Sequence, residues 1–207
     1  MTIEHTAPKD IEQRSFEIIR SELEKNNITL PLETEPVVMR AIHTTADFDY
    51  ARTLVFSQNA VEIIKNLITA HTDIVTDTNM AAAGINKGCL EKYGCALHCF
   101  MADSDVAQEA KNRNTTRACV AMEKAAAMNK KLIFCIGNAP TALIKLRELM
   151  DEGYEPGFIV GVPVGFVNVC EAKELIIEST ADYIVNRGRK GGSNVAAAII
   201  NAILYNI

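Results

Sequence analysis

Short apolar runs alternate with helix-like segments from residue 72 onward, and this alternation constrains the fold more than any other feature. The runs that predict strands are 72–77 (TDIVTD), 95–100 (CALHCF), 131–137 (KLIFCIG), 157–165 (GFIVGVPVG) and 183–188 (YIVNRG). The segments with apolar residues at helical spacing are 117–130, 139–153 and 167–180. Because parallel strands need crossover helices, the pattern predicts a three-layer α/β/α fold with a mostly parallel, doubly wound sheet of about five strands.

The first 70 residues carry mainly helical patterns, at 11–26 and 57–71. We expect a helical N-terminal region, residues 8–70, to pack on an α/β core formed by residues 71–207. At 207 residues the chain is long enough for one sizeable core, so a single domain over 1–207 is expected.

Charge and hydropathy exclude several classes of protein. The net charge of −5 argues against nucleic acid or a membrane surface as the main partner. No apolar run approaches the ~20 residues needed to span a bilayer, and the N-terminus lacks the features of a signal peptide. A cytoplasmic protein is therefore expected.

Six cysteines raise the alternatives of disulfides or a metal site. The sequence contains no CxxC pair, and Cys119, Cys135 and Cys170 lie in apolar surroundings. Buried free thiols in a reducing compartment are the preferred interpretation. Cys95, His98 and Cys99 form the only ligand-like cluster, but in a strand neighbouring side chains point to opposite faces, so no metal site is expected.

The segments that follow the predicted strands indicate where a ligand would bind. In open α/β sheets ligands bind beyond the carboxyl ends of the strands, where loops lead into helix N-termini. These loops are 77–84, 136–143, 161–168 and 186–194, and all are rich in small residues. Any one of them is better explained as a tight turn. Together they favour a broad surface lined by backbone amides, suited to carboxylates or phosphates.

Two basic features could serve such an anion. Arg187, Arg189 and Lys190 lie close together before a glycine-rich helix start, and a solvated turn is an equal alternative. Arg117 follows two threonines at a helix start, where a cation opposes the helix dipole. It is either used for binding or exposed to solvent. The GxxxxGK[ST] and dinucleotide-binding patterns are both absent.

His43 lies in the segment RAIHTTADFDYA, residues 40–51. Histidine is the usual proton exchanger near neutral pH, and an anionic ligand nearby would favour its charged form. A lone histidine is nevertheless more often structural, and neither a GxSxG motif nor a second histidine ligand accompanies it. The residues alone therefore indicate an α/β protein for an anionic small molecule, with His43 either structural or an acid–base group.

Seven segments together resemble the precorrin-8X methylmutase family, whose cobalt-containing branch acts on cobalt-precorrin-8. They are RSFEII (14–19), MRAIHTT (39–45), TDTNMAAAGI (76–85), TRACVAME (116–123), IGNAPTAL (136–143), GVPVGFVNVCEAKE (161–174) and RGRKGGSNVAAAIINAIL (187–204). The resemblance runs in order from about residue 10 to 205. Two positions depart from the expected pattern: Ala118 replaces a serine, and Ala46 stands where glycine is expected.

The resemblance implies an isomerase of cobalamin biosynthesis that moves a methyl group from C-11 to C-12 on ring C. The product would be hydrogenobyrinate or, with cobalt present, cobyrinate. No cofactor is implied, because any cobalt belongs to the substrate, an anionic tetrapyrrole. The family is dimeric, so a homodimer with sites near the subunit boundary is expected.

The family's catalytic histidine matches His43, whose implied role is to protonate or hydrogen-bond a ring nitrogen. The expected substrate contacts, from the motifs and the clustered donors, are Ser15, Arg40, Arg14, Thr44, Arg117, Arg187 and Arg189. Two other hypotheses stay open: a corrinoid carrier without catalysis, and a different α/β enzyme acting on phosphorylated metabolites. The segment HTTADFD favours the cobalt-containing branch.

Overall fold

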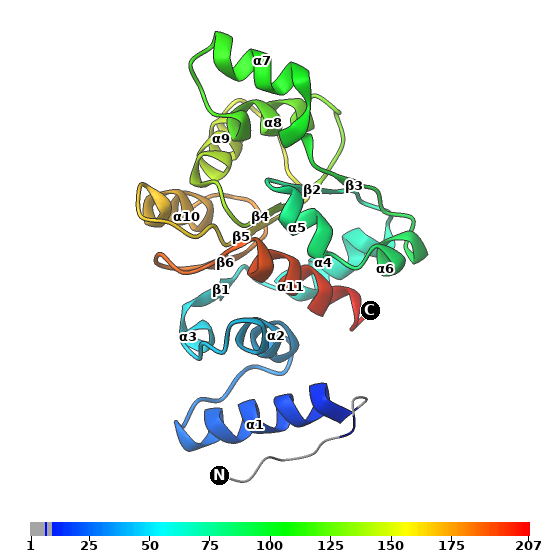
Figure 1. Ribbon diagram of the computed structural model, residues 1–207, viewed down its shortest axis with the longest axis vertical. Helices are drawn as coiled ribbons and strands as arrows, with labels where there is room; N and C mark the ends of the chain where they lie inside the picture. Colours follow the sequence, from blue (N-terminus) through cyan, green and yellow to red (C-terminus); the bar gives the residue numbers. More distant parts are fainter. Residues whose placement is uncertain (1–6, 8–9) are drawn as a thin grey trace.

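A six-stranded sheet forms the centre of the computed structural model, which describes residue 7 and residues 10–207 (Figure 1). The strands are β1 (Leu54–Phe56), β2 (Ile74–Thr76), β3 (Leu97–His98), β4 (Ile133–Ile136), β5 (Phe158–Gly161) and β6 (Tyr183–Asn186). Their order across the sheet is β1-β6-β5-β4-β2-β3. β1 runs antiparallel to β6, and every other pair is parallel. The mixed α/β fold class predicted from the sequence is confirmed.

The five predicted runs each contain one of the parallel strands, but the strands are shorter than the runs. The run 95–100 contributes only β3, and Phe100–Ala102 forms the short 3-10 helix η2. β1 was not predicted, so the expectation of about five strands is one too few. This strand has three residues in a segment with a helical pattern on its C-terminal side, which leaves too short an apolar run to identify.

Eleven α-helices surround the sheet in the described part of the chain. They are α1 (Ile11–Lys25), α2 (Glu35–Thr45), α3 (Tyr50–Thr53), α4 (Ala60–Thr69), α5 (Asn79–Gly84), α6 (Lys87–Lys92), α7 (Ser104–Asn112), α8 (Arg117–Ala126), α9 (Pro140–Asp151), α10 (Val169–Ile177) and α11 (Ser193–Leu204). α9 begins at Pro140, as predicted, because a helix start does not need the missing N–H. None of the described helices is long and apolar enough to cross a membrane.

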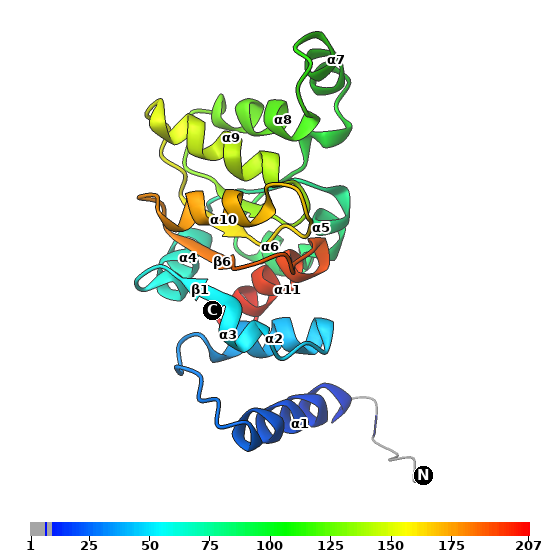
Figure 2. The same cartoon turned by 90° about the vertical axis from the view of Figure 1, so that its left-hand side faces the viewer.

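Successive residues of a strand contribute to two separate hydrophobic cores, as expected for strands covered on both faces. Phe134 and Ile136 of β4 pack with residues of α8, α9 and α10. Ile133 and Cys135 face the other way and pack with α11, α4 and α2. The sheet therefore lies between two helical layers, which Figures 1 and 2 show above and below it.

The N-terminal helices extend the molecule on one side only. α2 packs on α11, and α1 packs on the outer side of α2, so the chain adds two further layers beyond the three expected (Figure 2). β1 belongs to the same segment but joins the sheet. The boundary between residues 70 and 71 stays a prediction, and residues 8–9 of the expected N-terminal region lie outside the described residues.

All six cysteines are free thiols, as expected. Cys95 and Cys135 are buried, whereas Cys119 and Cys170 are only half-buried, so the expectation of burial is wrong for this second pair. Each of the two lies in the first turn of its helix, where the side chains are only partly covered by the core.

Candidate active site

α2 presents three polar side chains on one face because its apolar residues occupy the opposite face. Val37, Val38, Ala41 and Ile42 are among its buried residues. Positions 43 and 44 lie three and four residues after position 40, which places the three side chains on a common face of the helix. Arg40 is half-buried there, and His43 and Thr44 are exposed.

A pocket of about 270 Å³ opens beside this face. α2, α5 and α11 all contribute to its wall. The lining residues are Arg40, His43, Thr44, Gly84, Asn194, Ala197, Ala198, Asn201 and Tyr205. The structure thus brings together three of the residues predicted for the site. Asn194 and Asn201 of α11, and Tyr205 just after it, were not predicted.

His43 differs from the other described histidines in its lack of a polar partner. His71 Nδ1 lies 2.6 Å from the carbonyl oxygen of Tyr93, and His98 Nε2 lies 3.0 Å from Asp73 Oδ2. The side chain of His43 makes no hydrogen bond or ion pair with any residue that the structure describes. Its ring packs instead against Phe16, with 5.2 Å between ring centroids and 50° between planes. Both ring nitrogens are therefore available to a ligand in the pocket.

Arg40 is held by three neighbours. Its guanidinium pairs with Glu12 and lies 4.9 Å from the ring centroid of Phe16 and 5.4 Å from that of Tyr205. Thr44 Oγ1 donates to the carbonyl oxygen of Arg40 at 2.8 Å. Substrate contacts through Arg40 and Thr44 stay predictions, and for Arg40 Glu12 is a competing partner.

α1 brings Arg14 and Ser15 towards this region, next to Phe16. Ser15 is half-buried, and its hydroxyl donates to the carbonyl oxygen of Ile11 at 2.9 Å. Arg14 Nη1 lies 3.5 Å from Glu17 Oε2. Neither residue lines the pocket at His43. Their roles as substrate contacts stay predictions.

Arg117 lies far from His43 within one chain. It is the exposed first residue of α8, which covers the opposite face of the sheet from α2 (Figure 1). Thr116 caps the same helix by accepting from the amide of Cys119 at 3.2 Å, and its hydroxyl lies 3.0 Å from that of Thr141. A single subunit therefore does not bring Arg117 and His43 to one site.

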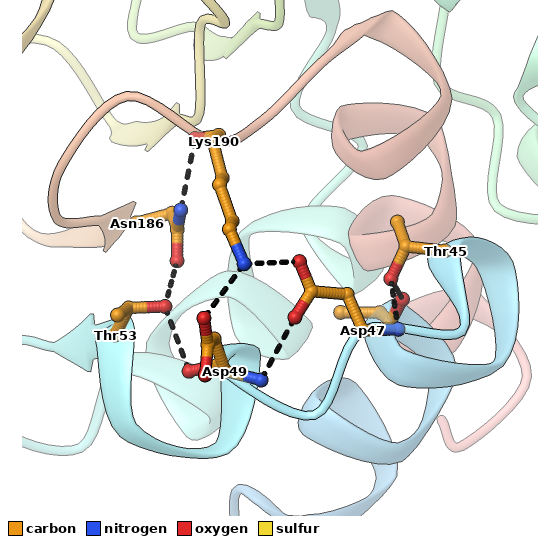
Figure 3. A network of polar contacts seen from close by, with 7 residues as sticks. Thr45, Asp47, Asp49, Thr53, Asn186 and Lys190 are labelled. Atoms are coloured by element: carbon orange, nitrogen blue, oxygen red, sulfur yellow. Dashed lines mark hydrogen bonds and ion pairs between the residues drawn. The ribbon is translucent and has the colours of Figure 1, made fainter.

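The basic segment 187–190 is an anchored loop. Arg187 Nε donates to Glu174 Oε1 at 3.2 Å, and the Arg189 guanidinium lies 5.7 Å from the ring centroid of Phe166. Lys190 donates to carboxylates of the turn that follows α2, as Figure 3 shows. The three cations thus have different neighbours in the chain, although all three side chains are exposed, so both the anion site and the solvated turn stay predictions.

The carboxylate of Asp77 occupies some of the backbone amides that were expected to line the ligand-binding surface. This residue follows β2 and is fully buried. Its carboxylate accepts from the backbone amides of Gly137, Asn138 and Ala139 at 2.9, 2.8 and 2.6 Å. Burial raises the pKa of Asp77, and these hydrogen bonds oppose the shift. The amides after β4 therefore bind an internal carboxylate, because β2 and β4 are neighbours and their carboxyl ends meet at the same edge.

Lys173 of α10 holds the backbone of the basic segment 187–190, a role that sequence reasoning missed. It is fully buried, and its Nζ donates to the carbonyl oxygens of Gly188 and Lys190 at 2.7 and 2.9 Å. Burial lowers its pKa to about 8. Lysine is almost never fully buried unless it is paired, so a helical lysine was expected at the surface. The available signal was its position in the apolar face of α10, with Val169, Ala172 and Ile176.

No group of three or more histidine, cysteine, aspartate or glutamate side chains suited to a metal ion occurs among the residues that the structure describes. His98, from the ligand-like cluster, is half-buried and shares Asp73 with Lys130. Burial raises the pKa of Asp73, but the hydrogen bonds from Lys130, His98 and the amide of Ala96 outweigh it and bring the pKa to about 2.

Comparisons with known proteins agree over almost the whole chain. The sequence model of precorrin-8X methylmutase matches residues 10–206. Cobalt-precorrin-8 methylmutase of Priestia megaterium is 43% identical over 197 residues, 95% of this chain and 87% of the relative. The protein of the same name from Salmonella typhimurium is 42% identical and covers 97% of this chain and 96% of its own. The solved structure of precorrin-8X methyl mutase from Thermus thermophilus superposes with a TM-score of 0.86, at 37% identity, over 95% of this chain and 96% of the other.

Proposed function

The chain belongs to the precorrin-8X methylmutase family, and we propose that it moves a methyl group from C-11 to C-12 of the corrinoid ring with His43 as the acid–base group. It is an isomerase of cobalamin biosynthesis. The observation that carries the proposal for His43 is its position in a pocket without a hydrogen-bonding partner among the described residues.

The proposed step is an internal rearrangement. The bond between C-11 and the methyl carbon breaks as the bond from C-12 to that carbon forms, and no atom or electron leaves the substrate. Protonation or hydrogen bonding of a ring nitrogen by His43 polarises the conjugated system and is reversed when the step ends. One positioned proton donor is typically worth about 10²–10⁴ in rate. Since the step is redox-neutral, we propose that it requires no cofactor.

We propose cobalt-precorrin-8 as the substrate and cobyrinate as the product. The names of the two relatives at 43% and 42% identity support this choice over the metal-free ring. The cobalt would arrive as part of the substrate. Five arginines that are exposed or half-buried supply cations for the carboxylates of the substrate, and two hydroxyl groups supply further donors. The arginines are Arg14, Arg40, Arg117, Arg187 and Arg189, and the hydroxyl donors are Ser15 and Thr44. The six free thiols support a reducing compartment, the cytoplasm.

We propose further that the working unit is a homodimer. The pocket at His43 has a volume of about 270 Å³, which is below the ~300–1,000 Å³ typical of small-molecule sites, and a corrinoid macrocycle is a large ligand. A second subunit would enlarge the site. It would also give Arg117 a route to a substrate bound at the His43 of the other subunit.

The test is conversion of cobalt-precorrin-8 by the purified protein, followed by absorption spectroscopy and mass spectrometry. Methyl migration changes the conjugated path, so the spectrum should change while the mass stays constant. Precorrin-8 without cobalt, run in parallel, distinguishes the two branches. Tight binding of the corrinoid with an unchanged spectrum would instead identify a carrier, and no binding of either compound would overturn the proposal.

A further inference from the structure

Two lysines hold the basic loop 187–190, one from inside the molecule and one from its surface. Lys173 lies in the core and binds the loop's backbone at Gly188 and Lys190. Asn186 is also fully buried, and its Nδ2 donates to the same Lys190 carbonyl at 2.9 Å. Buried donors therefore fix the backbone of the loop, independently of the loop's exposed side chains.

The side chain of Lys190 extends from this fixed backbone to the turn after α2 (Figure 3). Its Nζ donates to Asp47 Oδ2 and to Asp49 Oδ2, each at 2.6 Å. The turn is ordered by its own contacts as well. Asp47 Oδ1 accepts from the amide of Asp49 at 3.0 Å, and Thr45 Oγ1 accepts from the amide of Asp47 at 3.2 Å. The hydrogen bond from Lys190 lowers the pKa of Asp47, which favours the charged pair at neutral pH.

A second connection runs beneath the ion pairs. Thr53 Oγ1 lies 2.6 Å from Asn186 Oδ1, and the amide of Arg187 donates to the carbonyl oxygen of Thr53 at 2.8 Å. The segment from Thr45 to Thr53 is thus joined to the segment from Asn186 to Lys190 at both its ends. These two segments are more than 130 residues apart in the sequence.

Each of the two joined segments leads into the candidate site. The turn at 46–49 follows directly on Thr45, two residues beyond His43 in α2. The loop carries Arg187 and Arg189 and leads through Gly191 and Gly192 into α11, whose residues Asn194 and Ala197 face His43 across the pocket. A side chain at position 191 would meet the carbonyl oxygen of Val162 at 2.0 Å, so this path of the loop requires glycine there.

We propose that Lys190 is a positioning residue of the enzyme: by binding Asp47 and Asp49 it fixes the end of α2, and hence His43, relative to the loop of Arg187 and Arg189. The proposal rests on the function proposed above, in which these groups act on one corrinoid. Lys173 and Asn186 provide the fixed base from which Lys190 acts.

The contact of Lys190 with Asp47 and Asp49 positions the site and contributes little to the stability of the fold. The side chains of Lys190, Asp47 and Asp49 are 49%, 27% and 56% exposed, and solvent screens ion pairs at such exposures. Loss of the pair should therefore leave the folded state almost as stable as before. Small displacements of reacting groups, in contrast, can reduce a rate by up to about 10². A large kinetic effect with a small effect on stability is the signature of the proposed role.

The kinetic test compares Lys190→Gln, Lys190→Arg and Lys111→Gln. Lys111 is an exposed lysine of α7 whose side chain makes no hydrogen bond or ion pair with the described residues, so its variant controls for the lost charge. We expect kcat/KM to fall about tenfold in Lys190→Gln, with Tm equal to that of Lys111→Gln. Lys190→Arg should recover most of the loss because its guanidinium can bind both carboxylates. Equal kcat/KM in the two glutamine variants would overturn the proposal.

A double-mutant cycle identifies the contact that acts. The cycle replaces both aspartates together, because Lys190 binds each of them. If Lys190 works through this pair, Lys190→Gln should reduce kcat/KM no further in a protein that already carries Asp47→Asn and Asp49→Asn. Multiplied effects would overturn the proposal.

Hydrogen exchange without substrate tests the connection independently of the reaction. Amides of residues 46–50 should exchange faster in Lys190→Gln than in Lys111→Gln, and unchanged exchange would overturn the proposed connection. If the wild-type protein failed to convert cobalt-precorrin-8, the proposed function would fail while this measurement would still decide the structural claim.

Discussion

The ring of Phe16 lies against the ring of His43, with 5.2 Å between their centroids and an angle of 50° between their planes. The contact joins α1 to α2 at the candidate site. Phe16 offers the imidazole no hydrogen-bonding group, and His43 lines the pocket. Phe16 therefore orients the proposed acid–base group without competing for its proton.

Replacing Phe16 by leucine should lower kcat by a few fold, because His43 loses the flat surface that orients it. The free energy of unfolding should fall by about 0.5–1.5 kcal/mol, the usual worth of an aromatic pair. Steady-state kinetics and urea unfolding measure the two effects. In a His43→Ala background the kinetic effect of Phe16→Leu should vanish, and its persistence there would show that Phe16 acts on another group.

Ala46→Gly should stabilise the protein. Ala46 ends α2 in the left-handed region, with φ of 54° and ψ of 26°. This conformation costs a residue with a Cβ about 1 kcal/mol, and glycine adopts it freely. The free energy of unfolding should rise by up to about 1 kcal/mol with kcat unchanged. Ala46→Val should have the opposite effect, and a lower stability of the glycine variant would contradict the explanation.

Asp77→Asn should destabilise the fold markedly. An asparagine side chain carries an NH₂ group towards amides that need acceptors, and hydrogen bonds to a charged group are worth about 1.5–3 kcal/mol each. We expect a loss of at least about 2 kcal/mol in the free energy of unfolding. Asp151→Asn, which removes an exposed partner of Arg147, is the matched control and should cost far less. Similar losses in both variants would refute the role assigned to Asp77.

Lys173 should make stability rise with pH between about 8 and 10.5. Its pKa is lowered from 10.5 to about 8 in the folded protein. In that window the unfolded chain binds more protons than the folded one, so raising the pH favours the folded state. Below pH 8 the full cost of burying the charge applies. Urea unfolding of wild type and Lys173→Met at pH 7.5 and 9.5 should show that the wild type gains relative to the variant, and a constant difference would disprove the shifted pKa.

The sequence predicted the parallel part of the sheet well because buried parallel strands are continuous apolar runs. It did not reveal β1, whose three residues carry too little pattern. His43, Arg40 and Thr44 were predicted from their motif, and the structure places all three beside one pocket. The role of Asp77 could not be read from the chain, because its partners at 137–139 depend on which strands are adjacent. For Lys190 the sequence left an anion site and a solvated turn as equal alternatives, and it could not show that the side chain reaches Asp47 and Asp49, some 140 positions earlier.

The central claim is that His43 acts on the proton balance of the corrinoid during methyl migration. The most direct measurement is a single turnover of cobalt-precorrin-8 with wild type and with His43→Ala, followed by absorption, together with the affinity of each protein for the substrate. The account predicts conversion by the wild type and a rate at least about 10² lower in the variant, with substrate binding and folding retained. Conversion by His43→Ala at the wild-type rate, or loss of its folded state, would return His43 to a structural role.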